Sequence, residues 1–167
     1  SGSGITSEMD DQSSFISDHS SGGLSFWRSL TYAILASSAQ VIDVPRAELD
    51  GLFRPVENEP GITELVLYDN VASGAGHSKK IAGKFQEVLE RTLGLVSSCS
   101  CGSSCYDCLR TYTNQIFHDD LDRHLVRRFL LPIVEQLRPD DRQKAFAPHS
   151  SRVDGERVTL LLDRAVR

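Results

Sequence analysis

The chain has 167 residues and a mass of 18.5 kDa; 40% of its residues are hydrophobic and 25% are charged. A chain of this length buries roughly 70% of the surface that its unfolded form exposes, which suits one hydrophobic core better than two. No stretch approaches the roughly 18 consecutive apolar residues of a membrane span, and no export signal is visible. We therefore expect a globular protein in the cytoplasm, with no membrane contact.

The formal net charge is -5, but the two parts of the chain differ in sign. Residues 1–70 hold 11 acidic and 3 basic residues, a net charge of -8. Residues 71–167 hold 12 acidic and 15 basic residues, a net charge of +3. Any contact with a polyanion such as DNA is therefore expected in the second part.

The first third of the chain predicts a linker and two helices. Residues 1–23 contain eight serines and four glycines, a composition typical of a flexible linker or of an arm left from cloning. Residues 24–41 carry apolar side chains at helical spacing, which predicts a buried helix. Pro45 suits the first turn of a short helix that reaches Leu52, before a loop rich in proline.

The middle third predicts a strand, a tight turn and a helix. Residues 62–68 supply apolar side chains to both faces, as expected of a central strand. The turn at residues 69–77 contains glycines, and the helix after it is expected to end at Gly94. A further helix is expected at residues 106–116.

The last part predicts one more helix and a return to the sheet. This helix begins at Asp119 or Asp120 and reaches Leu137, and Pro132 should kink it or end it early. Residues 138–156 are expected to form a polar loop, and residues 157–163 a return strand of the same domain. The predicted fold class is α+β, mostly helical, with a small sheet and a four-cysteine zinc knuckle that ties two helices together; the core domain spans residues 24–137.

All four cysteines fall within ten residues, in the pattern C-x-C-x3-C-x2-C formed by Cys99, Cys101, Cys105 and Cys108. Four thiolates make a closed tetrahedral shell that leaves no position for substrate, which predicts one structural zinc ion per chain. Two disulfides, an iron–sulfur cluster, or a redox pair at Cys105 and Cys108 are the alternatives. Because metal binding at such a site is coupled to folding, a chelator should destabilise the domain.

The glycine turn is a candidate anion site. Backbone N–H groups near Gly74 and Gly76, together with Lys79 and Lys80, suit an anion such as a phosphate. The alternative is that the glycines adopt positive φ angles and the lysines are solvated. No Walker A loop and no dinucleotide fingerprint is present.

Arg123 and Arg127 are four residues apart and therefore share a helix face. They are candidates for DNA phosphates, or for ion pairs with Asp119 and Asp120 of the preceding turn.

Three residues form a candidate catalytic site. Asp69, His77 and His118 are types that perform acid/base chemistry, although a lone histidine also serves as a hydrogen-bonded structural group. Trp27 and Tyr32 of the first predicted helix are expected in the core or on a surface that faces a partner.

Three segments carry a resemblance to a known family. They are SFWRSLTYAILASSAQVIDVPRAELDGLF, LVLYDNVASGAGHSKKI and CSCGSSCYDCLRTYTNQIFHDDLDR. Over residues 24–137 the chain resembles the zinc-binding C-terminal domain of MrfA-type superfamily 2 DNA helicases, a domain also found in DrmB-like proteins of DISARM anti-phage systems. The family commonly has proline where this chain has Ala72 and glycine where it has Ser73.

The resemblance implies a non-catalytic accessory domain that positions a helicase motor in DNA repair or anti-phage defence, with the four cysteines as zinc ligands. The motor would lie in the same natural chain or in a separate subunit, and the DNA backbone is a further expected contact. The motor motifs are absent, so the chain is not expected to be an enzyme by itself. Two alternatives stay open: a hydrolytic or nuclease domain that uses Asp69, His77 and His118, and a protein-interaction adaptor that uses Trp27, Tyr32 and the acidic first part.

Overall fold

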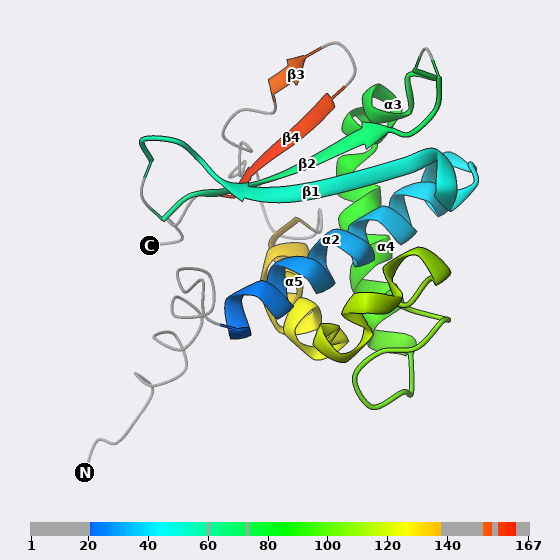
Figure 1. The fold of residues 1–167 in the computed structure, drawn as a ribbon, viewed down its shortest axis with the longest axis vertical. Coiled ribbons are helices and arrows are strands. Elements are labelled where there is room, and N and C mark those ends of the chain that lie inside the picture. The colour runs from blue at the N-terminus through cyan, green and yellow to red at the C-terminus, as the bar shows by residue number, and fades with distance from the viewer. Residues whose placement is uncertain (1–20, 60, 73, 138–151, 155–156, 163–167) are drawn as a thin grey trace.

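Helices dominate the fold, and a small antiparallel sheet lies beside them (Figure 1). The computed structural model describes residues 21–59, 61–72, 74–137, 152–154 and 157–162. In chain order the elements, with η for a 3-10 helix, are α2 (Ser21–Ile42), η1 (Arg46–Glu48), β1 (Leu49–Pro55), β2 (Thr63–Asp69), α3 (His77–Gly83), α4 (Phe85–Ser98), η2 (Tyr112–Asp120), α5 (Arg123–Leu137), β3 (Arg152–Asp154) and β4 (Arg157–Leu162). The predicted α+β class is confirmed.

The sheet has the strand order β1-β2-β4-β3, and each neighbouring pair is antiparallel. Strand β2 pairs with β1 on one side and with β4 on the other, and its residues Leu65, Val66 and Leu67 are all buried. A strand that is covered on both faces needs consecutive apolar residues, so the predicted central position of this strand is confirmed. The predicted return strand is β4.

The predicted short helix that reaches Leu52 is wrong. Only Arg46–Glu48 form a helical turn, and Leu49–Pro55 pair with β2 along their whole length. A Cβ atom at Gly51 would lie 3.0 Å from both Leu67 Cδ2 and the Val66 carbonyl oxygen, so this glycine permits a close approach to β2. Pairing with the apolar strand β2 outweighs the local signal of the proline, because strand formation depends on cross-strand packing.

Helix α2 is buried along most of its length, which confirms the predicted buried helix. Its apolar side chains, among them Leu30 and Leu35, enter one core together with side chains from the sheet, α4 and α5. Ser29 and Thr31 donate their hydroxyls to carbonyls one turn earlier, at Ser25 and Trp27. Serine, threonine and alanine keep the helix narrow, so other elements pack closely around it.

The helix that follows the glycine turn is two helices rather than one. Helix α3 ends at Gly83, Lys84 leaves the helical conformation, and α4 continues to Ser98. The predicted end at Gly94 is therefore wrong. Gly94 lies exposed inside α4, whose buried residues Val88, Leu93 and Val96 stabilise the helix by packing on both sides of that position.

The predicted helix at residues 106–116 is also wrong. The cysteine loop extends to Arg110, and a 3-10 helix follows at Tyr112–Asp120. Thr111 caps this 3-10 helix through a reciprocal pair of bonds with Asn114, which starts the helix later than apolar spacing suggests. Helix α5 starts at Arg123 and continues past Pro132 to Leu137, so the proline does not end it early. Leu130 and Val134 are buried on either side of that proline.

No helix in the described ranges is both long and apolar enough to cross a bilayer. The predicted linker lies outside the described residues up to residue 20, and residues 21–23 begin α2. Residues 138–151 of the predicted polar loop also lie outside the described residues. Within the same stretch Arg152–Asp154 form β3, and residues 155–156 lie outside the described residues.

Candidate metal centre and glycine turn

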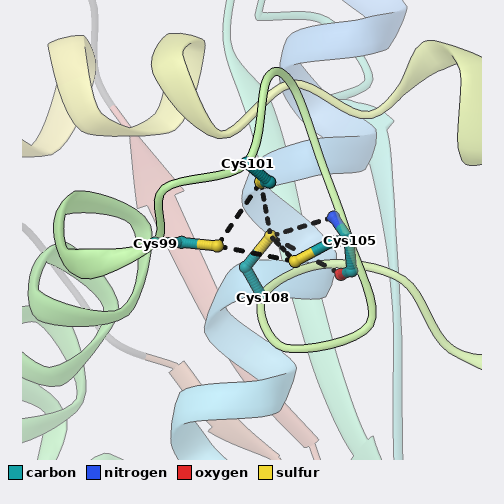
Figure 2. A group of neighbouring side chains, drawn as sticks. All are labelled: Cys99, Cys101, Cys105 and Cys108. Atoms are coloured by element: carbon teal, nitrogen blue, oxygen red, sulfur yellow. Dashed lines mark hydrogen bonds between the residues drawn. The ribbon is translucent and has the colours of Figure 1, made fainter.

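The four cysteine sulfurs converge at the end of α4. Cys99 caps the helix, and the other three cysteines lie on the loop that follows (Figure 2). The Sγ–Sγ distances are 3.4 Å for Cys99–Cys101, 3.5 Å for Cys99–Cys105, and 3.7 Å for both Cys101–Cys108 and Cys105–Cys108. All four sulfurs lie within 4.8 Å of one another, and no disulfide joins them.

These distances test the fit of a metal. A tetrahedral zinc ion with Zn–S bonds of about 2.3 Å places its sulfur ligands about 3.8 Å apart. Four of the six sulfur pairs are already within 0.4 Å of that separation. The cluster can therefore hold one zinc ion with small movements of side chains.

The turn from Cys105 to Cys108 is shaped by its own backbone. The Cys105 carbonyl accepts the N–H groups of Cys108, Leu109 and Arg110, at 3.2, 3.1 and 2.9 Å. The Cys105 N–H points at the Cys108 sulfur, 3.2 Å away. An N–H that donates to sulfur favours the thiolate, which is the form that binds metal.

The first turn of α5 holds the loop from outside. The buried Arg123 guanidinium donates to the Val96 carbonyl at 2.9 Å and twice to the Cys101 carbonyl, at 3.0 and 2.8 Å. The next residue, His124, places Nε2 2.6 Å from the Gly102 carbonyl oxygen. The loop is thus fixed to α4 and α5 by contacts to backbone carbonyls.

The 3-10 helix η2 supports the other side of the loop. Asn114 is fully buried and donates to the Leu109 carbonyl at 2.9 Å, while His118 Nε2 lies 2.9 Å from Asn114 Oδ1. Arg110 donates to the Ser104 hydroxyl at 2.8 Å, and the Tyr106 ring lies edge-on to His118. These side chains of the Arg-x-x-x-Asn-x-x-x-His stretch pack the loop against η2.

The metal-free thiols differ in acidity. Burial raises the pKa of Cys108 to about 12, whereas the Cys101 backbone N–H and the neighbouring thiols lower the pKa of Cys99 to about 7. Since a bound metal requires all four thiolates, metal binding releases the protons that the thiols carry.

The glycine turn lies at the other end of α4. Gly74 and Gly76 have φ angles of +65° and +73°, as the conformational explanation of these glycines predicts. The Asp69 carboxylate accepts the N–H groups of Ala75, His77 and Ser78, at 2.8, 3.0 and 2.8 Å, and the Ser78 hydroxyl at 2.5 Å. These backbone N–H groups, which were predicted to bind a phosphate, therefore donate to the protein's own Asp69 carboxylate. Lys79 and Lys80 are exposed.

Residues 30–109 match the family model of the MrfA Zn-binding domain, a stretch that includes all four cysteines. The resemblance to this domain is confirmed. Together, the MrfA Zn-binding match and the cysteine cluster support one structural zinc ion.

A curated relative is similar to part of the chain. The Druantia protein DruE of Escherichia coli (strain UMEA 4076-1) is 35% identical over 95 residues, which are 55% of this chain and 5% of DruE. The chain therefore spans a small fraction of that relative's length. No solved structure matches the chain with statistical significance.

The structure does not bring the three candidate catalytic residues together. His77 donates its backbone N–H to Asp69, and its Nε2 lies 2.8 Å from Glu48 Oε2. His118 lies in η2 beside the cysteine loop. Helix α4, whose 14 residues give a length of about 20 Å, separates the glycine turn from that loop (Figure 1).

The two candidate DNA-contacting arginines have different surroundings. Arg123 is 8% exposed, and its guanidinium donates to the Val96 and Cys101 carbonyls. Arg127 is exposed and lies beside a shallow groove. The groove has a volume of about 400 Å³ and is lined by His124, Arg127, Arg128, Leu131, Pro132 and Glu135. Asp120 pairs with Arg28 at 2.5 Å, so the expected ion pair of Asp120 with α5 is not formed.

The aromatic residues of α2 face inward. Trp27 is 4% exposed and stacks on Phe53, and the half-buried Tyr32 packs against Phe117. The sequence did not reveal the partner of Glu48 or the role of Asn114. Asn114 stands between the polar residues Thr113 and Gln115, so local apolar patterning did not indicate its burial. Glu48 carried no signal either, because its partner His77 is 29 residues away.

Proposed function

We propose that this protein is a non-catalytic, zinc-stabilised accessory domain that positions the motor of a DNA helicase, in DNA repair or anti-phage defence. Cys99, Cys101, Cys105 and Cys108 are the zinc ligands in this proposal. The observation that carries it is the convergence of four thiols where α4, η2 and α5 meet. A closed tetrathiolate shell fixes helices relative to one another and offers no position for chemistry.

The proposed domain spans residues 24–137, with residues 138–167 as its polar loop and return strand, and residues 1–23 as a linker. The motor lies in the same natural chain or in a separate subunit. The match to 5% of DruE supports a module that works inside a larger protein.

Metal content and thiol titration test the metal centre. We expect one zinc ion and four protected thiols per chain, and loss of the zinc in Cys108→Ser. Ser100→Ala, a change at an exposed position of the same loop, is the control and should retain zinc. Iron in place of zinc, or no metal with four free thiols, would contradict the proposal.

Assays of ATP hydrolysis and DNA cleavage test the non-catalytic part. ATP hydrolysis is not expected of the protein alone, because the sequence contains no Walker A loop. DNA cleavage is not expected, because Asp69 and His77 lie at the far end of α4 from His118. Cleavage that is lost in His77→Ala while zinc content is unchanged would establish the hydrolytic alternative instead.

The exposed cations Lys79, Lys80 and Arg127 are the proposed contacts to DNA phosphates. Binding to a fluorescent duplex, measured by anisotropy, should weaken as salt rises from 50 to 200 mM, as expected of phosphate contacts. Charge reversal at Lys80 and at Arg127 should weaken DNA binding further. Charge reversal at Arg123 is not an informative control, because that residue is buried. Absence of salt-dependent binding would favour the adaptor function.

The adaptor function is the second candidate, and exposed apolar side chains favour it. Tyr106, Tyr112 and Ile116 are 64%, 82% and 84% exposed, and all three lie on or beside η2. Such side chains commonly anchor protein interfaces. Tyr112→Ser and Ile116→Ser should reduce co-elution with the separately expressed motor on size-exclusion chromatography, whereas the control Leu52→Ser, on β1, should not.

A further inference from the structure

Arg123 is a buried cation without an anionic partner. Its exposed fraction is 8%, and among the residues that the structure describes no carboxylate oxygen lies within 4.0 Å of its guanidinium. Arg28 and Arg54, by contrast, are 26% and 63% exposed at their side chains and both pair with a carboxylate. Burial of a charge is unfavourable unless an opposite charge compensates it.

The guanidinium points at the cysteine loop from the side of α5. Three of its hydrogen bonds go to backbone carbonyls: one to that of Val96, ahead of Cys99, and two to that of Cys101 itself. The Arg123 backbone N–H also donates to the Ser103 carbonyl, at 2.8 Å. The residue therefore contacts the chain on both sides of Cys99 and Cys101.

A zinc ion held by four thiolates carries a net charge of about -2. Positive charge and N–H donors next to such a centre stabilise it, and partners outside the ligand shell orient the ligands. Arg123 brings both to the loop that carries the cysteines. Arg110, the arginine of the cysteine loop itself, donates instead to the Ser104 hydroxyl.

We propose that Arg123 is a positioning residue of the metal centre: its charge compensates the anionic zinc–thiolate cluster, and its three hydrogen bonds fix the turn that presents Cys99 and Cys101. The inference rests on the proposed zinc ligation by the four cysteines. It assigns Arg123 to the metal centre and not to DNA.

Zinc affinity, measured by competition with a chromophoric chelator, tests the proposal. Arg123→Gln loses the charge and the guanidinium fork that bonds both the Val96 and the Cys101 carbonyls. It should weaken zinc binding on the order of tenfold or more. Arg123→Lys keeps the charge and loses the fork, and should fall between Arg123→Gln and the unchanged protein. Arg127→Gln, one turn further along α5 and exposed, is the matched control and should bind zinc normally.

A second measurement distinguishes compensation of the zinc–thiolate charge from a purely structural role of Arg123. The stability of each variant is compared with zinc bound and after chelation. A structural role lowers both stabilities equally, whereas compensation of the cluster lowers the zinc-bound stability more, because the metal-free protein gains by losing an unpaired buried charge.

The outcomes separate the two proposals. No zinc in the unchanged protein would overturn the proposed function and this inference with it. One zinc in the unchanged protein, with zinc affinities of Arg123→Gln and Arg123→Lys within twofold of it, would overturn the inference alone. If Arg123→Gln does not fold, Arg123→Lys decides: weaker zinc binding together with a changed absorption spectrum of the cobalt-substituted protein supports the role, and unchanged values for both overturn it.

Discussion

At the scale of residues, Asp69 satisfies the N–H groups at the start of α3 with one carboxylate. Asp69→Asn removes the charge and turns one oxygen into an NH2 group that faces N–H donors. We expect the free energy of unfolding to fall by about 1 to 3 kcal/mol. Urea denaturation measures this change, with Asp107→Asn at an exposed position of the cysteine loop as the control. Equal losses in the two variants would contradict the role of Asp69.

The same carboxylate predicts a pH dependence. Burial alone raises the pKa of Asp69, but hydrogen bonds from Ser78, Ala75 and His77 outweigh it and lower the pKa to about 2, from an ordinary 3.8. Because the folded-state pKa lies below the unfolded one, this stabilisation is present above pH 3.8 and is lost as the pH falls through about 2. Stability measured between pH 5 and pH 2 should therefore fall less steeply in Asp69→Asn. Parallel curves would exclude the effect.

The sequence predicts some of these residues and not others, for a physical reason. The four cysteines lie within ten positions, so their spacing alone indicates a shared metal. The contacts of Arg123 depend on how α5 packs against the end of α4, and its spacing to Arg127 indicated only a shared helix face. A basic side chain at a buried position of an amphipathic helix was the available signal.

At the scale of elements, Gly76 and Gly94 are expected to respond in opposite ways to substitution by alanine. Gly76 has a φ angle of +73°, whereas Gly94 lies inside α4 with open space where a Cβ would be. We expect Gly76→Ala to destabilise the protein by about 1 to 2 kcal/mol, because an L side chain is strained there. Gly94→Ala should stabilise it by about 0.5 to 1 kcal/mol, because alanine favours helix. Thermal unfolding compares the two, and shifts of the same sign would contradict this assignment.

The element predictions succeed where the pattern is long and fail where it is short. Helix α2 and strand β2 have continuous apolar patterns that match their burial. Strand β1 has a burial pattern that weakens along its length and is defined by pairing with β2, which no local window contains. The 3-10 helix η2 depends on side-chain bonds of Thr111, Asn114 and His118, and these are invisible to apolar periodicity.

At the scale of the whole molecule, the metal centre and the sheet lie at opposite ends of α4 (Figure 1). Chelation of zinc should therefore act locally first. We expect amide hydrogen exchange to accelerate at residues 99–124, where the loop depends on the cluster, and to change less at residues 49–69, whose ladder bonds do not involve it. Uniform acceleration along the chain would show instead that the domain unfolds as one unit without metal.

The length of helix α4 determines both the direction in which the cysteine loop leaves the helix and the distance of that loop from the sheet. Each residue of an α-helix turns the chain by about 100°, so one residue inserted near exposed Glu90 would rotate the cysteine loop away from the arginine of α5 and from η2. Four inserted residues would restore most of the direction but would move the loop about 6 Å further from the sheet. The number of residues in this helix therefore determines the geometry of the metal centre, as much as the spacing of its cysteines does.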